Sequence, residues 1–220
     1  FFCGNSLTAA DIAWAPFLER YRYQLPCLHL GLEPDNSAVY PNLAGWYKAM
    51  DMRVPAYACR IKGDASSWRK VLTMAGFGNA GVPADVGQTM QSRNALEENE
   101  ACEMDMVKAL ALWQEYAVLR PFVASSPAAQ AALIVTRNRQ AILEDLSKRA
   151  AAELPSTDVV TLNEALRTMV HLLLENSSVE DLLVDKEESI LRQTVLVLTT
   201  FLDERMCIPR DMGAMSSACI

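Results

Sequence analysis

The sequence has little glycine and few runs of β-branched residues: 9 of its 220 residues are glycine. Strands favour β-branched and aromatic side chains, so the scarcity of such runs argues against a sheet. Alanine, leucine, methionine, glutamate and arginine, which favour helices, dominate instead. The composition predicts an all-α protein, and the length fits one domain or two small ones.

Long apolar runs and an excess of basic residues are also missing. The best apolar candidate covers residues 194–202, between Arg192 and Asp203, whereas a membrane helix needs about 20 apolar residues. The net charge is −7, and the excess of acidic residues falls after residue 75. These features argue against a membrane-spanning segment, nucleic-acid binding and docking on anionic lipid.

Patterns for metal binding and nucleophilic catalysis are scarce as well. No two of the six cysteines have C-x-x-C spacing, and the two histidines are His29 and His171. We therefore expect no metal site. His171 lies between apolar residues and is expected in the core, while Cys27 and His29, two residues apart, do not face each other on a helix. We expect free thiols in an intracellular, reducing compartment.

The clearest local signal is the start of a helix at Thr8. Its hydroxyl can accept the backbone N–H of Asp11, and the Asp11 carboxylate can accept the N–H of Thr8, which is the acidic form of a capping box. The apolar residues that follow are expected to form the buried face of this helix; they are Ile12, Trp14, Ala15 and Leu18.

A second helix is expected from Pro41, because proline suits a first helical position. Leu43, Trp46 and Met50 follow at i, i+3 and i+7 and predict one buried stripe. A third helix is expected to be capped by Ser66 and Ser67.

Residues 76–92 contain four glycines and Pro83, and we expect them to be a linker. They include the pattern G-x-G-x-x-G, but a dinucleotide loop needs a strand before it and a helix after it. A helix is expected before it instead, so the linker interpretation is favoured. We therefore predict a helical domain at 1–75, a linker at 76–92 and a second helical bundle at 93–220.

The second bundle is expected to contain at least four helical stretches separated by short polar or proline-bearing loops, as in an antiparallel bundle. The expected stretches are Ala95 to Arg120, Pro127 to Leu154, Leu162 to Glu175 and Glu187 to Met206.

Three motifs, taken in order, resemble the C-terminal helical domain of the glutathione transferases. They cover residues 5–75, about a third of the chain. The motifs are Thr8-x-x-Asp11, Tyr40-Pro41-x-Leu43-x-x-Trp46 and Met50-x-x-Arg53-x-Pro55-Ala56-Tyr57.

The resemblance implies structural roles. Thr8 and Asp11 would form a buried capping box that serves folding, and Trp46 and Tyr57 would belong to the structural core. In that family the residue that activates glutathione lies in a thioredoxin-like half that precedes this one, and no such half is found in this sequence. The resemblance therefore carries over no catalytic residue and no defined cofactor-binding residue, and glutathione is implied only if the complete protein is an active transferase.

Two functions follow from the resemblance. The first is a non-catalytic interaction or scaffold module that binds a protein partner or its own preceding thioredoxin-like domain; the sequence starts without Met, so we expect earlier chain. The second is the C-terminal part of an active glutathione transferase that conjugates or reduces small electrophiles.

The remaining chain resembles an extension of plastid transferase-like proteins of plants and algae, at residues 135–139 and 208–212. This resemblance implies a larger chloroplast assembly and a place in the chloroplast stroma, with the cytosol as the alternative. Arg137 and Arg139 lie in this extension and are expected to be solvated or salt-bridged. A role in holding a phosphate or a glutathione carboxylate stays open.

Overall fold

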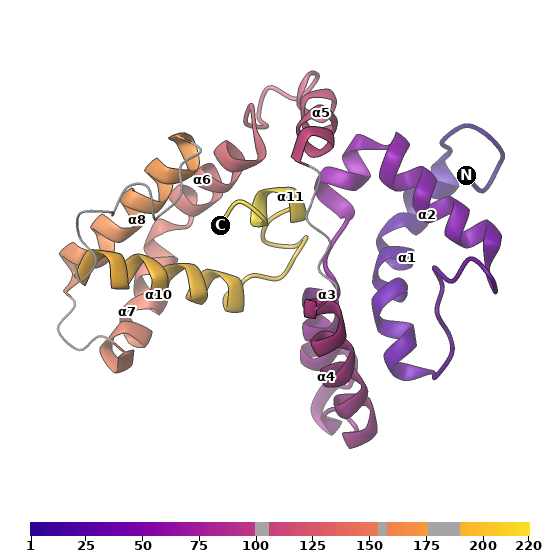
Figure 1. Ribbon diagram of the computed structural model, residues 1–220, viewed down its shortest axis with the longest axis horizontal. Coiled ribbons are helices and arrows are strands. Elements are labelled where there is room, and N and C mark those ends of the chain that lie inside the picture. The colour runs from indigo at the N-terminus through magenta and orange to yellow at the C-terminus, as the bar shows by residue number, and fades with distance from the viewer. Residues whose placement is uncertain (100–105, 154–157, 176–189) are drawn as a thin grey trace. The chain divides into compact units, whose positions relative to one another are not determined.

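The computed structural model describes residues 1–99, 106–153, 158–175 and 190–220 (Figure 1). These residues form helices joined by turns and loops, and they contain no β-strand, so the all-α prediction is confirmed. No helix in the described ranges is long and apolar enough to cross a membrane. The α-helices are α1 (Ala9–Leu28), α2 (Pro41–Arg53), α3 (Ala65–Val71), α4 (Ala84–Asn99), α5 (Met106–Ala117), α6 (Pro127–Arg137), α7 (Arg139–Glu153), α8 (Val159–Glu175), α10 (Ile190–Arg205) and α11 (Ala214–Ser217).

The chain divides into two compact units. Unit 1 contains Phe1–Tyr116 and Cys207–Ala214, and unit 2 contains Ala117–Met206 and Met215–Ile220. The chain thus leaves unit 1, builds unit 2 and returns to unit 1 before its last residues. Local sequence gave no signal for this return.

The core of unit 1 lies between α1, α2 and the π-helical turn Tyr57–Ile61. Trp46 and Tyr57 are buried there, with exposed fractions of 3% and 2%. Their rings meet edge to face, with centroids 6.0 Å apart, an arrangement that aromatic pairs favour. Leu43 and Leu18 pack against this cluster while partly buried. Trp46 and Tyr57 thus belong to the buried core of unit 1.

The expected linker differs from what the structure shows. Its glycine-rich first part forms short turns, but α4 begins at Ala84. Val86 and Met90, four residues apart on one face of α4, are buried in a cluster with Cys27 and Leu72. The structure corrects the linker prediction for this part, because two apolar side chains at helical spacing suffice to anchor a helix that is otherwise polar. The division between the units falls after residue 116 rather than at 76–92.

Two helix boundaries also differ from expectation. Asp64 caps α3 by accepting the N–H of Ser67 at 2.7 Å, whereas Ser66 and Ser67 were expected as caps. The single helix expected from Pro127 is interrupted at Asn138, whose side chain donates to the carbonyl of Ile134 at 2.9 Å. Asparagine competes locally for backbone partners and so favours a helix end at this point.

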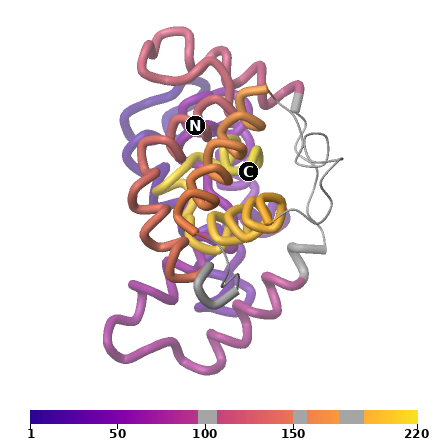
Figure 2. Tube along the Cα trace, turned by 90° about the vertical axis from the view of Figure 1, so that its left-hand side faces the viewer, coloured from indigo at the N-terminus to yellow at the C-terminus, as the bar shows by residue number. Residues whose placement is uncertain are grey.

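Unit 2 is built around α8. Helices α6, α7 and α10 all pack against it, and Figures 1 and 2 show α8 beside α10. The buried face of α8 is apolar, and it carries Leu162, Ala165, Leu166, Met169, Leu172 and Leu173. This stripe fixes which side of α8 faces the core of unit 2.

Candidate functional site

Asp11 is the centre of a buried hydrogen-bond network at the start of α1. The structure places Thr8 at the N-cap and Asp11 three residues later, with both arms of a capping box present. One carboxylate oxygen, Oδ2, accepts the N–H of Thr8 at 2.9 Å and its hydroxyl at 2.7 Å. The other, Oδ1, accepts the N–H of Phe2 at 2.8 Å and the indole N–H of Trp46 at 2.9 Å. One side chain thus joins the N-terminal segment, α1 and α2.

These bonds keep the Asp11 carboxylate ionised although it is fully buried. Burial opposes ionisation, but the four donors from Phe2, Thr8 and Trp46 outweigh it and hold the pKa of Asp11 well below its usual range. A carboxylate whose acceptor sites are all occupied by such donors has no free electron pair aimed at a substrate. Its role is to hold the fold together.

Glu19 is the second buried carboxylate of α1, two helical turns after Asp11. Its Oε2 accepts the phenol of Tyr57, and its Oε1 accepts the N–H of Gly63 at 2.9 Å. Burial raises the pKa of Glu19 above its ordinary value of 4.5, although both hydrogen bonds oppose the shift. Tyr57 therefore acts as a donor to Glu19, and burial beside this carboxylate raises the pKa of its phenol.

The raised pKa of Glu19 predicts a pH-dependent stability. Because folded Glu19 binds its proton more tightly than unfolded Glu19, its ionisation lowers the stability as the pH rises above about 4.5. Glutamine at position 19 cannot ionise, and in Glu19→Gln the amide can accept the N–H of Gly63 and donate to the Tyr57 oxygen. We expect this variant to lose less unfolding free energy than the wild type between about pH 5 and about pH 8. Asp11 adds no slope there, because its pKa is shifted the other way.

Urea unfolding at both pH values checks this prediction. All four tryptophans lie in unit 1, so their fluorescence follows that unit. Glu33→Gln is the matched control, because Glu33 makes an ion pair with Arg93 that is only partly buried. If the unfolding free energies of Glu19→Gln and the wild type depend on pH in the same way, the ionisation of Glu19 does not lower the stability of the folded protein.

The opposite face of α1 is apolar but exposed. Trp14, Phe17 and Tyr21 follow one another at i, i+3 and i+7, and 51%, 49% and 37% of their surfaces are accessible. The rings of Trp14 and Phe17 meet edge to face at 6.0 Å. Ile12 is 62% exposed. Ile12 and Trp14 were expected in the core, and this was wrong because the buried face of α1 instead carries Asp11, Ala15 and Glu19.

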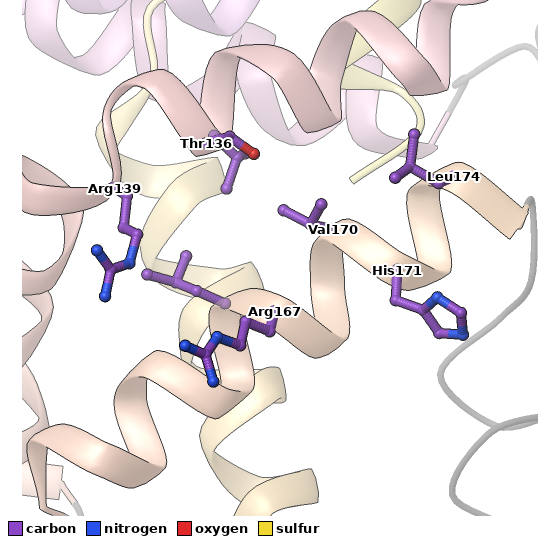
Figure 3. A pocket seen from close by; sticks show the side chains of 8 residues that line it. Thr136, Arg139, Arg167, Val170, His171 and Leu174 are labelled. Carbon is purple, nitrogen blue, oxygen red and sulfur yellow. The ribbon is translucent and has the colours of Figure 1, made fainter.

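Unit 2 contains an open-sided cavity of about 330 Å³ between α6, the start of α7 and α8. Its lining combines apolar and cationic side chains, as Figure 3 shows: Val135, Thr136, Arg139, Leu166, Arg167, Val170, His171 and Leu174. The prediction that His171 is a core histidine was wrong, because it is exposed at the rim. His171 is not on the buried stripe of α8, which includes Leu172 and Leu173, so an apolar neighbour in the sequence does not imply that the histidine is buried.

A second cavity, of about 300 Å³, lies between α3 and α4 in unit 1. Its lining is more polar and includes Arg69 and Asn94. The Arg69 guanidinium donates to the Asn94 amide at 2.7 Å. This bond links α3 to α4 and gives Arg69 a structural role.

Metal and disulfide chemistry find no support among the described residues. No group of histidine, cysteine and carboxylate side chains in that part of the chain could hold a metal ion. Among these residues, Cys3, Cys207 and Cys219 are free thiols, and Cys27 and Cys59 are buried. Cys102 lies outside the described residues.

Comparison with known families gives a match over the start of the chain. Residues 1–49 match the family described as "Glutathione S-transferase, C-terminal domain". The match covers α1 and most of α2, the two helices joined by the hydrogen bond from Trp46 to Asp11. Residues 1–49 are therefore similar to the C-terminal helical domain of glutathione S-transferases. Comparisons with curated proteins and with solved structures gave no match.

Sequence reasoning missed Glu19 and the cationic cavity. Glu19 lies at i+8 from Asp11 and i+4 from Ala15, so a polar residue on the buried stripe was a detectable signal. Arg167 and His171 lie four residues apart on α8, which places them on one face, but Arg139 joins them only because α7 packs against α8.

Proposed function

We propose that this protein is a non-catalytic interaction module that binds another protein through the exposed aromatic stripe of α1, defined by Trp14, Phe17 and Tyr21. The observation that carries the proposal is that α1 is apolar on its exposed side while its other side is already buried. A group of adjacent apolar side chains exposed on a protein surface commonly marks a site of interaction with another protein.

The chemistry of the stripe fits a protein partner. Aromatic side chains are enriched in protein interfaces and supply much of their binding energy. Arg20, one helical turn after Phe17 and also exposed, adds a cation at the rim. We infer a partner surface that is apolar at its centre and acidic beside Arg20. The buried carboxylates of α1 support the proposal, because their bonds hold the stripe on a fixed backbone.

Site-specific photo-crosslinking in the cells that make the complete protein tests the proposal. A photoreactive phenylalanine analogue at Phe17 should give one discrete adduct, and the same analogue at Lys48, on the exposed side of α2, should not. Mass spectrometry then identifies the adduct, and the purified partner is titrated against the wild type. The double variant Trp14→Glu, Phe17→Glu should weaken binding by more than about tenfold. Equal binding by the variant, or no adduct at Phe17, would contradict the proposal.

The family match favours a second candidate, the C-terminal part of an active glutathione transferase. In that case the stripe would be covered by the protein's own preceding domain. Glutathione conjugation and thiol transfer by the complete protein distinguish the two candidates. Sustained turnover supports the transferase and overturns the non-catalytic module.

We further propose a reducing intracellular compartment, the chloroplast stroma or the cytosol, and a place in a larger assembly. The buried free thiol of Cys207 supports this proposal. The distribution of a fluorescent fusion of the complete protein tests it.

A further inference from the structure

We propose that the cavity between α6 and α8 binds a small amphipathic anion, a molecule with one negatively charged head group and an apolar tail. The proposal concerns unit 2 alone and does not depend on the aromatic stripe of α1. It rests on three properties of the cavity: its apolar floor, the cations at one end and its size.

The floor and one wall of the cavity are apolar. Val135 from α6 and Leu166 from α8 form the buried floor, with exposed fractions of 2% and 3%. Val170 and Leu174 continue this surface along α8 at i+4 and i+8, and Leu174 is 59% exposed. An alkyl chain lying along this row would cover apolar surface that now contacts water, and such burial drives binding.

The cations lie at the other end of the row. Figure 3 shows the guanidinium groups of Arg139 and Arg167 on the same side of the cavity, away from Leu174. Arg139 donates to the neutral amide of Asn163 and makes no ion pair within the described parts of the chain. Arg167 lies 3.6 Å from Glu164, with both side chains largely exposed, so this pair contributes little. Both guanidinium groups can therefore donate hydrogen bonds to one anionic head group.

The volume limits the ligand to a small molecule. At about 330 Å³, the cavity is near the lower end of the range of about 300–1,000 Å³ for ligand pockets. A single medium-length alkyl chain suits this size better than a two-chain lipid. The net charge of −7 also disfavours attraction to an anionic bilayer. The ligand is therefore expected to be a free, soluble monoanion.

Decanoate is the probe, used below its critical micelle concentration with the complete protein. Calorimetric titration should show one saturable site of submillimolar affinity, and nuclear magnetic resonance should localise the shifts to Thr136, Val170 and Leu174. Decanol, which has the tail without the charge, and acetate, which has the charge without the tail, should each bind at least tenfold more weakly. Vesicles that contain an anionic lipid should not bind the protein through this site.

Matched variants separate the cavity from general charge. The double variant Arg139→Gln, Arg167→Gln should weaken decanoate binding at least tenfold, and Val170→Phe should weaken it by filling the cavity. Arg137→Gln is the control, because Arg137 is exposed nearby but does not line the cavity. Circular dichroism checks that each variant is folded.

The remaining outcomes overturn the proposal. They are no saturable binding of decanoate, equal binding by the wild type and the double arginine variant, equal binding of decanol, and binding to anionic vesicles without binding of free decanoate.

Discussion

Replacing Asp11 with alanine is expected to lower the unfolding free energy of unit 1 by on the order of 3 kcal/mol, while leaving any chemistry of the protein untouched. The substitution removes the acceptor of four hydrogen bonds at once. The indole N–H of Trp46 would then be left in the core, and an unsatisfied buried donor costs about 1–3 kcal/mol. Loss of the cap on α1 adds about 1 kcal/mol. Because four hydrogen bonds are lost together, we expect this to be one of the two largest decreases in stability.

Tryptophan fluorescence during urea unfolding measures the effect, because the tryptophans report on unit 1. Asp35→Ala is the matched control: Asp35 also accepts a hydrogen bond, from Arg22 at 2.9 Å, but on the surface. Its loss should cost less than about 1 kcal/mol. Equal effects of the two substitutions would show that the Asp11 network does not hold α1 and α2 together.

Acid should reproduce part of the effect of Asp11→Ala. The pKa of Asp11 is lowered in the folded state, so its contribution is complete above the unfolded pKa of about 3.9 and is lost as the pH falls below that value. The difference in stability between the wild type and Asp11→Ala should therefore shrink in acid. Glu19 acts in the opposite direction and over a higher range of pH.

Replacing Gly213 with alanine should destabilise unit 1 by on the order of 3 kcal/mol. A Cβ at this position would lie 2.2 Å from the carbonyl oxygen of Cys59. The clashing oxygen belongs to the backbone of the turn Tyr57–Ile61, so it cannot rotate away as a flexible side chain could. The Cys59 side chain is fully buried, which also holds this turn in place. Overpacking of this kind costs about 1–3 kcal/mol and sometimes more.

The control for Gly213 is a glycine with free space around it. Gly45 lies inside α2, is exposed, and has no atom within 4 Å of a Cβ at its position. Gly45→Ala should raise the stability by up to about 1 kcal/mol, because alanine suits a helix better than glycine. The same fluorescence measurement serves both variants. Opposite signs are expected, and a neutral Gly213→Ala would mean that residues 207–214 do not pack against the turn at Cys59.

Gly213 also shows where sequence reasoning ends. Residues 207–214 pack against the rest of unit 1, and one of their contacts is a hydrogen bond from the N–H of Ile208 to the Ser67 hydroxyl at 3.0 Å. The two residues are 141 positions apart. No local pattern encodes a contact at that separation, so a helix-by-helix reading assigned all residues after 92 to one bundle.

The sequence by itself determined the helical class and the start of α1. Helix-forming composition and apolar spacing act within a few residues, and Thr8 and Asp11 are close enough to interact through local backbone geometry alone. The residues shared with the transferase family lie in this same local stretch.

Only the tertiary structure decided which face of α1 is buried and where a ligand could bind. The exposed face of α1 carries Trp14 and Phe17, whereas the buried face carries Asp11 and Glu19, so apolar spacing favoured the wrong side. The packing of α2 and the Tyr57 turn decided which face is buried. The cavity in unit 2 likewise exists because α6 and α7 pack on α8 and bring Arg139 to the same end as Arg167. Spacing along a helix fixes which side chains share a face, whereas the burial of that face depends on elements distant in the sequence.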